Sequence, residues 1–168
     1  MSGKVAIFFL LLVHHLCSTS LSCDVLSLWK HETLASPGDV FELGFFNPGM
    51  HPIWYLGIWL KQDPDRTALW VANRNQPLIG SHGTLRVSNS NLVLFDRDNY
   101  HVWSTSINGT VSPHVVVKIL DNGNLVVKED TSDTNQFLWQ SFDFPTDSII
   151  SEMNLRTGTG NIEILMNR

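Results

Sequence analysis

The chain has 168 residues, of which 43% are hydrophobic and 16% are charged, and these proportions predict one globular domain with a substantial core. Its formal net charge of -5 at pH 7 provides no basic surface for nucleic acid, so we exclude nucleic-acid binding. After the N-terminal region no segment is long and apolar enough to form a transmembrane helix, so no membrane span is predicted.

The N-terminal region has the pattern of a secretory signal peptide. Lys4 precedes an uninterrupted apolar run over residues 5–13, and small polar residues follow. The run is shorter than the roughly 20 apolar residues that span a bilayer. We therefore predict a signal peptide over residues 1–22, with cleavage before Cys23 or, alternatively, after Ser20. The mature chain is then expected to be secreted and extracellular.

Cysteine content limits how the mature chain is stabilised. Cys17 lies within the predicted signal peptide, so Cys23 is the one thiol that remains and no internal disulfide can form. Burial of apolar surface must therefore stabilise the domain. Cys23 is either a free thiol near the N-terminus or a bridge to a second chain, which would make a dimer.

The first predicted β-unit extends from Phe41 to Trp70. Apolar segments at residues 41–46 and 54–59 flank the turn Asn47-Pro48-Gly49, which predicts a pair of antiparallel strands. The aromatic side chains of this unit are expected in the core, with the alternative that one ring is exposed and stacks on a sugar or a partner; they are Trp54, Tyr55 and Trp59.

The second and third units contain a repeat. The string Asn-Leu-Val occurs at Asn91 and, 33 residues later, at Asn124, and each copy follows another asparagine by two residues, Asn89 or Asn122. Tryptophan recurs in each of the three units, at positions 70, 103 and 139. Helical periodicity is nowhere sustained, so we predict an all-β domain in which Trp70, Trp103 and Trp139 converge on a shared core.

A glycosylation sequon, Asn108-Gly109-Thr110, lies between the second and third units. It predicts an N-linked glycan on Asn108 at a surface turn, which agrees with a secreted protein.

Several motifs, in the same order along the chain, resemble the bulb-type mannose-binding lectin domain of plant S-locus glycoproteins and S-domain receptor-like kinases. They are Phe41–Gly49, Tyr55–Trp59, Trp70–Arg74, Leu120–Val126 and Leu138–Asp143. The resemblance implies the β-prism II fold, with three four-stranded antiparallel sheets in pseudo-threefold symmetry. It assigns residues 23–155 to the lectin domain and leaves residues 156–168 as a divergent tail that is either disordered or supplies a strand. Relatives continue into further modules, so a truncated or decaying gene product is one reading of the chain.

The same resemblance implies a sugar site with the pattern Gln-x-Asp-x-Asn-x-Val-x-Tyr, whose alternate side chains would share one face of a strand. Two degenerate copies occur: Val87, Asn89, Asn91, Val93 and Phe95, and then Leu120, Asn122, Asn124, Val126 and Lys128. Only the third and fourth positions match the pattern in each copy, and the first unit has no recognisable copy. Each substitution that leaves a sugar hydroxyl without a partner would cost about 1–3 kcal/mol.

These observations lead to one leading hypothesis and two alternatives. The leading hypothesis is a secreted, non-catalytic lectin-like module that binds mannose-type glycans or glycoproteins through Asn89, Asn91, Val93 and Phe95 or through Asn122, Asn124 and Val126. The first alternative is a protein-interaction module that has lost sugar binding and pairs with related receptor ectodomains. The second is that the repeated strings serve the fold, since Asn122-Gly123 favours a hairpin turn.

Catalytic chemistry is not indicated. The five histidines that follow the predicted signal peptide lie far apart in the sequence, at positions 31, 51, 82, 101 and 114, without the spacing of a metal site. The aspartate pairs at 63 and 65 and at 143 and 147 flank prolines in predicted turns. There is no nucleophile motif and no phosphate-binding loop. We therefore predict that the protein is not an enzyme and that it has no cofactor and no metal.

Overall fold

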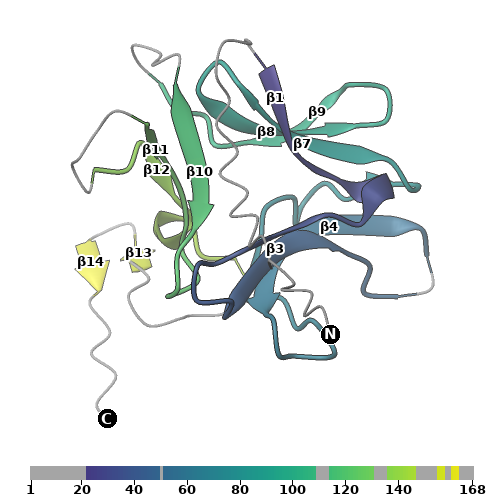
Figure 1. The fold of residues 1–168 in the computed structure, drawn as a ribbon, viewed down its shortest axis with the longest axis horizontal. Coiled ribbons are helices and arrows are strands. Elements are labelled where there is room, and N and C mark those ends of the chain that lie inside the picture. Colours follow the sequence, from purple (N-terminus) through teal and green to yellow (C-terminus); the bar gives the residue numbers. More distant parts are fainter. Residues whose placement is uncertain are drawn as a thin grey trace, which may run out of the picture.

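The computed structural model describes residues 22–49, 51–108, 114–130, 136–146, 155–157 and 160–162 (Figure 1). The predicted signal peptide, apart from Ser22, lies outside these residues, and so do Gly109 and Thr110 of the sequon. Strands dominate the described residues, and the two short 3-10 helices are η1 (Leu28–Lys30) and η2 (Ser141–Asp143). The prediction of an all-β fold is confirmed.

Three antiparallel sheets surround a common interior (Figure 1). The first contains β2 (Thr33–Ala35), β3 (Phe41–Phe46), β4 (Ile53–Leu60) and β5 (Trp70–Val71), and β6 (Leu78–Ile79) pairs with the start of β4. The second contains β1 (Ser22–Ser27), β7 (Gly83–Ser88), β8 (Asn91–Asp96) and β9 (His101–Ser104). The third contains β10 (Val115–Ile119), β11 (Leu125–Glu129) and β12 (Trp139–Gln140). This is the predicted β-prism, although the third sheet has three strands in the described residues instead of four.

A separate two-stranded hairpin follows, made of β13 (Leu155–Thr157) and β14 (Gly160–Ile162). The C-terminal tail, for which the sequence left disorder or a strand as alternatives, thus contributes strands in its described part.

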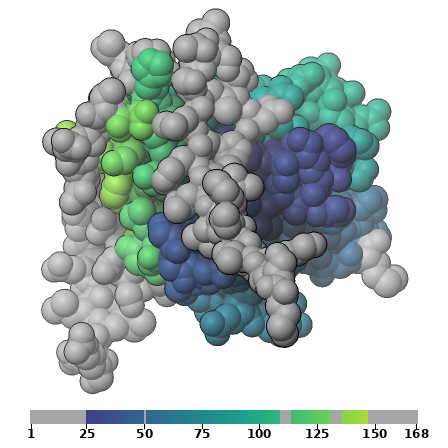
Figure 2. All heavy atoms as spheres, in the orientation of Figure 1, coloured from purple at the N-terminus to yellow at the C-terminus, as the bar shows by residue number. Residues whose placement is uncertain are grey.

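The N-terminal strand β1 pairs with β7, so the second sheet combines two segments that are distant in the sequence. In this pairing Cys23 lies opposite Val87. On the surface, purple residues from the N-terminal segment lie beside teal residues of the second unit (Figure 2). Cleavage before Cys23 would remove Ser22 from β1 and keep the rest of the strand, so the predicted mature chain retains this sheet.

The hairpin turns explain the positions of the asparagines in the repeat. Asn89 and Ser90, between β7 and β8, both have positive φ, at 48° and 62°, as a two-residue type I′ turn requires. Between β10 and β11, the Gly123 amide donates to the Leu120 carbonyl, and Gly123 has a φ of 87°. A Cβ atom at Gly123 would also come within 2.9 Å of the Phe41 ring. The predicted hairpin turn at Asn122-Gly123 is confirmed.

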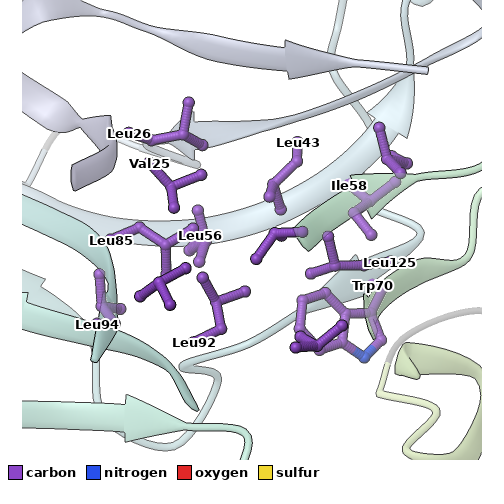
Figure 3. Packing of buried hydrophobic residues seen from close by; sticks show 14 of the residues in the cluster. Val25, Leu26, Leu43, Leu56, Ile58, Trp70, Leu85, Leu92, Leu94 and Leu125 are labelled. Atoms are coloured by element: carbon purple, nitrogen blue, oxygen red, sulfur yellow. The ribbon is translucent and has the colours of Figure 1, made fainter. Parts of the chain in front are cut away.

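Leucine side chains from all three sheets fill the interior (Figure 3). Leu43, Leu56, Leu85, Leu92 and Leu125 have no measurable exposure. Each belongs to a strand whose neighbouring side chains point to the opposite face, which is the alternation that sheet geometry imposes.

The three repeat tryptophans meet edge to face at the centre of the prism. The ring centroids are 5.7 Å apart for Trp70 and Trp103, 6.0 Å for Trp70 and Trp139, and 5.8 Å for Trp103 and Trp139. Trp70 and Trp139 are buried, and Trp103 is half-buried against the same core. One ring from each unit therefore closes the interior, with the geometry that aromatic quadrupoles favour.

Candidate functional site

One hydrogen bond recurs in all three units and aligns them in space. A leucine amide donates to a polar side chain that follows the repeat tryptophan by two or three residues. The pairs are Leu56 N to Asn73 Oδ1 at 2.8 Å, Leu92 N to Thr105 Oγ1 at 3.1 Å and Leu125 N to Ser141 Oγ at 2.9 Å. The residues that precede these leucines are therefore structurally equivalent, so Tyr55 takes the place of Asn91 and Asn124.

The side chain of Asn91 connects β8 to the segment after β9. Its Oδ1 atom accepts from the Thr105 hydroxyl at 3.0 Å and from the Ile107 amide at 2.6 Å. Its Nδ2 group donates to the carbonyls of Asn89 at 3.3 Å and Ile107 at 3.4 Å. Both ends of the amide thus have partners within the protein.

Asn124 has the same role in the third unit and is buried, with 4% exposure. Its Oδ1 atom accepts from the Ser141 hydroxyl at 3.2 Å and from the Phe142 amide at 3.3 Å. Its Nδ2 group donates to Gln140 Oε1 at 2.9 Å. A sugar hydroxyl could reach this amide only by replacing these partners.

The other predicted sugar residues are divided between turns and packed positions. Asn89 is exposed in the type I′ turn, and Asn122 Oδ1 accepts from the Asn124 amide at 3.1 Å. Val93 and Val126 are 4% and 1% exposed, so neither presents a surface on which a sugar ring could rest.

Phe95, the last predicted sugar residue of the second unit, is half-buried between two neighbours. Its ring packs edge to face against His101, at a centroid distance of 5.7 Å, and the Arg86 guanidinium lies over it at 5.3 Å.

The prediction that each copy occupies one strand is wrong. In the second unit Val87 lies on β7, where it pairs with Leu92 of β8, and Asn89 lies in the turn after β7. Asn91, Val93 and Phe95 occupy alternate positions of β8. In the third unit Leu120 and Asn122 likewise precede β11, whose first residue is Leu125. The hairpin turns, which require positive φ, interrupt the alternation that the pattern assumed.

In the first unit the equivalent face is aromatic. Tyr55, Gly57 and Trp59 alternate along β4 on the side opposite Leu56 and Ile58. A Cβ atom at Gly57 would lie 2.7 Å from the Phe46 ring, and one at Gly44 would lie 2.8 Å from the Trp59 ring. Each ring therefore covers a strand glycine, an arrangement known to stabilise sheets.

The sequence did not reveal this counterpart because the offset between units is not constant. The tryptophans of the first two units are 103 - 70 = 33 residues apart, whereas the equivalent leucines are 92 - 56 = 36 residues apart. A single shift cannot align both. The common signal is a leucine whose amide donates to a short polar side chain, two or three residues after the repeat tryptophan of the unit.

Of the three aromatic residues left open by the sequence, Trp59 is buried at 1% exposure, while Trp54 and Tyr55 are half-buried. The Arg66 guanidinium lies over the Trp59 ring at 5.3 Å from its centroid. Arg66 has a φ of 50°, a left-handed conformation that is uncommon for non-glycine residues.

The Asp63 side chain fixes the loop that holds Arg66. Its Oδ1 atom accepts from the Asp65 amide at 3.0 Å and its Oδ2 atom from the Thr67 amide at 2.8 Å. Hydrogen bonds from the Thr67 side chain and from these two amides lower the pKa of Asp63 from its ordinary value of 3.8.

Other chemistry is sparse in the part of the chain that the structure describes. It contains no group of three or more His, Cys, Asp or Glu side chains that could hold a metal ion. No helix within the described ranges has the length and hydropathy to cross a membrane. Asn108 of the sequon is exposed.

A sequence model of the family described as D-mannose binding lectin matches residues 67–165, more than half of the chain. Among curated proteins, receptor-like serine/threonine-protein kinase SD1-7 from Arabidopsis thaliana is 48% identical over 139 residues, which is 82% of this chain and 16% of the kinase. S-locus-specific glycoprotein BS29-1 from Brassica oleracea var. alboglabra is 44% identical over 174 residues, 95% of this chain and 39% of that protein. The chain thus spans well under half the length of these relatives, and the match to the kinase covers 16% of that protein.

Among solved structures, a monomeric monocot mannose-binding lectin from Gastrodia elata is similar over 71% of this chain and 96% of its own, with 16% identity and a TM-score of 0.39.

Proposed function

Because the chain belongs to the D-mannose binding lectin family, we propose that it is a non-catalytic, extracellular recognition module of the S-domain type. The similarity to S-locus glycoproteins over most of the chain supports this role. The predicted signal peptide and the exposed Asn108 of the sequon support secretion.

We further propose that its two Asn-Leu-Val strands no longer bind mannose. The observation that carries this proposal is the set of internal hydrogen bonds made by Asn91 and Asn124. Opening these bonds for a sugar would leave buried donors or acceptors without partners, at about 1–3 kcal/mol each. Since 1.4 kcal/mol is a factor of ten in affinity, one or two such losses would abolish weak monosaccharide binding.

The experiment is a glycan array probed with the secreted mature chain, residues 23–168, displayed on a multivalent carrier so that weak sites are detected. We expect no mannose-type signal that free methyl α-mannoside removes. A mannose signal that this competitor removes would overturn the loss of mannose binding and would restore the leading hypothesis from the sequence.

Besides glycans, we propose a related receptor ectodomain as a candidate partner. The receptor kinases among the relatives carry this domain as a small part of a longer protein. Large apolar side chains are exposed where a protein could cover them, with Trp29 at 59% and Ile79 at 75% exposure. Pull-down of the related ectodomains with the mature chain, and its loss in Ile79→Asp, would support this partner.

A further inference from the structure

Two neighbouring depressions lie on the aromatic side of the first sheet. One has a volume of about 380 Å³ and is lined by Phe46, Pro48, Tyr55, Ala68, Val71 and Arg74. The other, of about 480 Å³, shares Phe46, Pro48 and Ala68 with it and adds Arg66 and Thr67 among its lining residues. Together they form what we name the double depression. Each part is within the range of about 300–1,000 Å³ that is usual for small-ligand sites.

The floor of the double depression is aromatic. The rings of Phe46 and Tyr55 have centroids 5.8 Å apart and planes inclined by 31°, and both side chains are half-buried. Gly57 allows this arrangement, because a side chain there would displace Phe46. In the other two units the equivalent position is a valine, Val93 or Val126, so the aromatic floor is specific to the first unit. Two adjacent, partly exposed rings, although tilted to each other, offer apolar ring surface on which the C–H face of a sugar ring can stack.

The charge of the double depression differs from that of the whole chain. The chain has a net charge of -5, whereas each depression has an arginine in its wall, Arg74 or Arg66, and Asp65 is the one acidic residue among the lining side chains. Arg66 is exposed, and the loop that Asp63 fixes holds its guanidinium over Trp59. Arg74 donates through Nη1 to the carbonyl of Thr146, which orients its guanidinium.

Arginine in a fixed orientation binds carboxylates through two parallel hydrogen bonds. A ligand that places carboxylates beside flat apolar rings would therefore match both features of the double depression.

Strand pairing argues against an extended peptide as the ligand. Gly57 lies on β4, which pairs with β3 through Gly44 and with β5 through Val71. The floor therefore has no open strand edge to which a peptide backbone could add. A sugar needs no such edge, because its ring faces and substituents make the contacts.

We propose that the double depression binds an acidic oligosaccharide, a chain of uronic acid residues whose rings stack on Phe46 and Tyr55 and whose carboxylates pair with Arg66 and Arg74. The proposal rests on the recognition role proposed above, and it places the ligand on a different sheet from the two Asn-Leu-Val strands.

The test is isothermal titration of trigalacturonate into the secreted mature chain. We expect saturable binding that weakens as the salt concentration rises, because charge pairs at the surface are screened. The fully methyl-esterified trisaccharide, which keeps the rings and loses the charges, should not bind. Arg66→Gln and Arg74→Gln should each weaken binding about tenfold, as expected for loss of a hydrogen-bonded charge.

The matched control is Arg97→Gln, which removes the same charge from an exposed arginine that pairs with Asp98 in the turn between β8 and β9. It should bind trigalacturonate as the wild type does. Near-ultraviolet circular dichroism of each variant, which reports on the packing of aromatic side chains, verifies that the fold is intact.

Three results would overturn the proposal: no binding by folded wild-type protein, equal binding of the methyl ester, or an equal loss in Arg97→Gln. Binding of an acidic aromatic peptide at Arg66 and Arg74, with no binding of trigalacturonate, would overturn it as well. None of these results alters the mannoside competition on the glycan array, so this inference and the proposed loss of mannose binding can fail independently.

Discussion

The buried side chain of Asn124 accepts a hydrogen bond from the Ser141 hydroxyl, and the same hydroxyl accepts one from the Leu125 amide. This connection closes the third unit onto the segment that follows its tryptophan. Asn91 and Thr105 make the same connection in the second unit, with the Leu92 amide as donor.

Asn124→Ala should destabilise the domain by about 1–3 kcal/mol, because it leaves the Ser141 and Phe142 donors without their acceptor in a buried site. Asn91→Ala should have a smaller effect, since Asn91 is half-buried and the groups that lose their partner there are less fully removed from water. Urea unfolding followed by tryptophan fluorescence measures both. The control is Asn89→Gly, which suits the positive φ of an exposed turn and should leave stability nearly unchanged. Wild-type stability in Asn124→Ala would show that the asparagine does not serve the fold.

Gly57→Ala should destabilise the domain by about 1–3 kcal/mol, as overpacking does, because the added Cβ atom would lie 2.7 Å from the Phe46 ring and 2.9 Å from the Trp70 carbonyl. Thermal unfolding of the variant and of the wild type measures this loss of stability. Gly49→Ala is the matched control, since a Cβ atom there meets nothing within 4 Å. Equal melting temperatures for the two variants would mean that Phe46 does not lie over Gly57.

Acid should weaken the hydrogen bonds through which Asp63 fixes the loop that holds Arg66. The folded pKa of Asp63 lies below its ordinary value of 3.8, so its hydrogen bonds stabilise the fold at pH values above 3.8 and are lost as the pH falls through the lower, folded pKa. Asp63→Asn should therefore be less stable than the wild type at pH 6, and the difference should shrink on acidification below about pH 4.

Thermal unfolding at the two pH values measures this difference. A pH-independent difference for Asp63→Asn would contradict the assignment.

Secretion should leave a glycan on Asn108, which is exposed in the structure. Expression of the full chain in plant cells should yield a secreted protein whose mass falls on treatment with a glycosidase that removes N-linked glycans. Asn108→Gln should be secreted without that mass difference. Retention of the full chain inside the cell would contradict the predicted signal peptide.

The tryptophan spacing predicted the centre of the prism because one large ring per unit is the simplest way for three small sheets to share a core. The hairpin at Asn122-Gly123 was predicted because its turn chemistry is local. The pairing of β1 with β7 and of β6 with β4 was not predicted, since it depends on contacts between distant segments that no local pattern records. The roles of Asn91 and Asn124 were open in the sequence, because an asparagine that binds sugar and one that binds backbone look the same.

The most direct measurement of the central claim is a titration of methyl α-mannoside into the ¹⁵N-labelled mature chain, monitored through the side-chain amide signals of asparagine in NMR spectra. The account predicts that the signals of Asn91 and Asn124, assigned through their alanine variants, keep their positions up to high millimolar sugar, because both amides remain bonded to the protein. Saturable shifts of either signal would show that the strand opens to bind mannose, and would contradict the conclusion that these asparagines serve the fold.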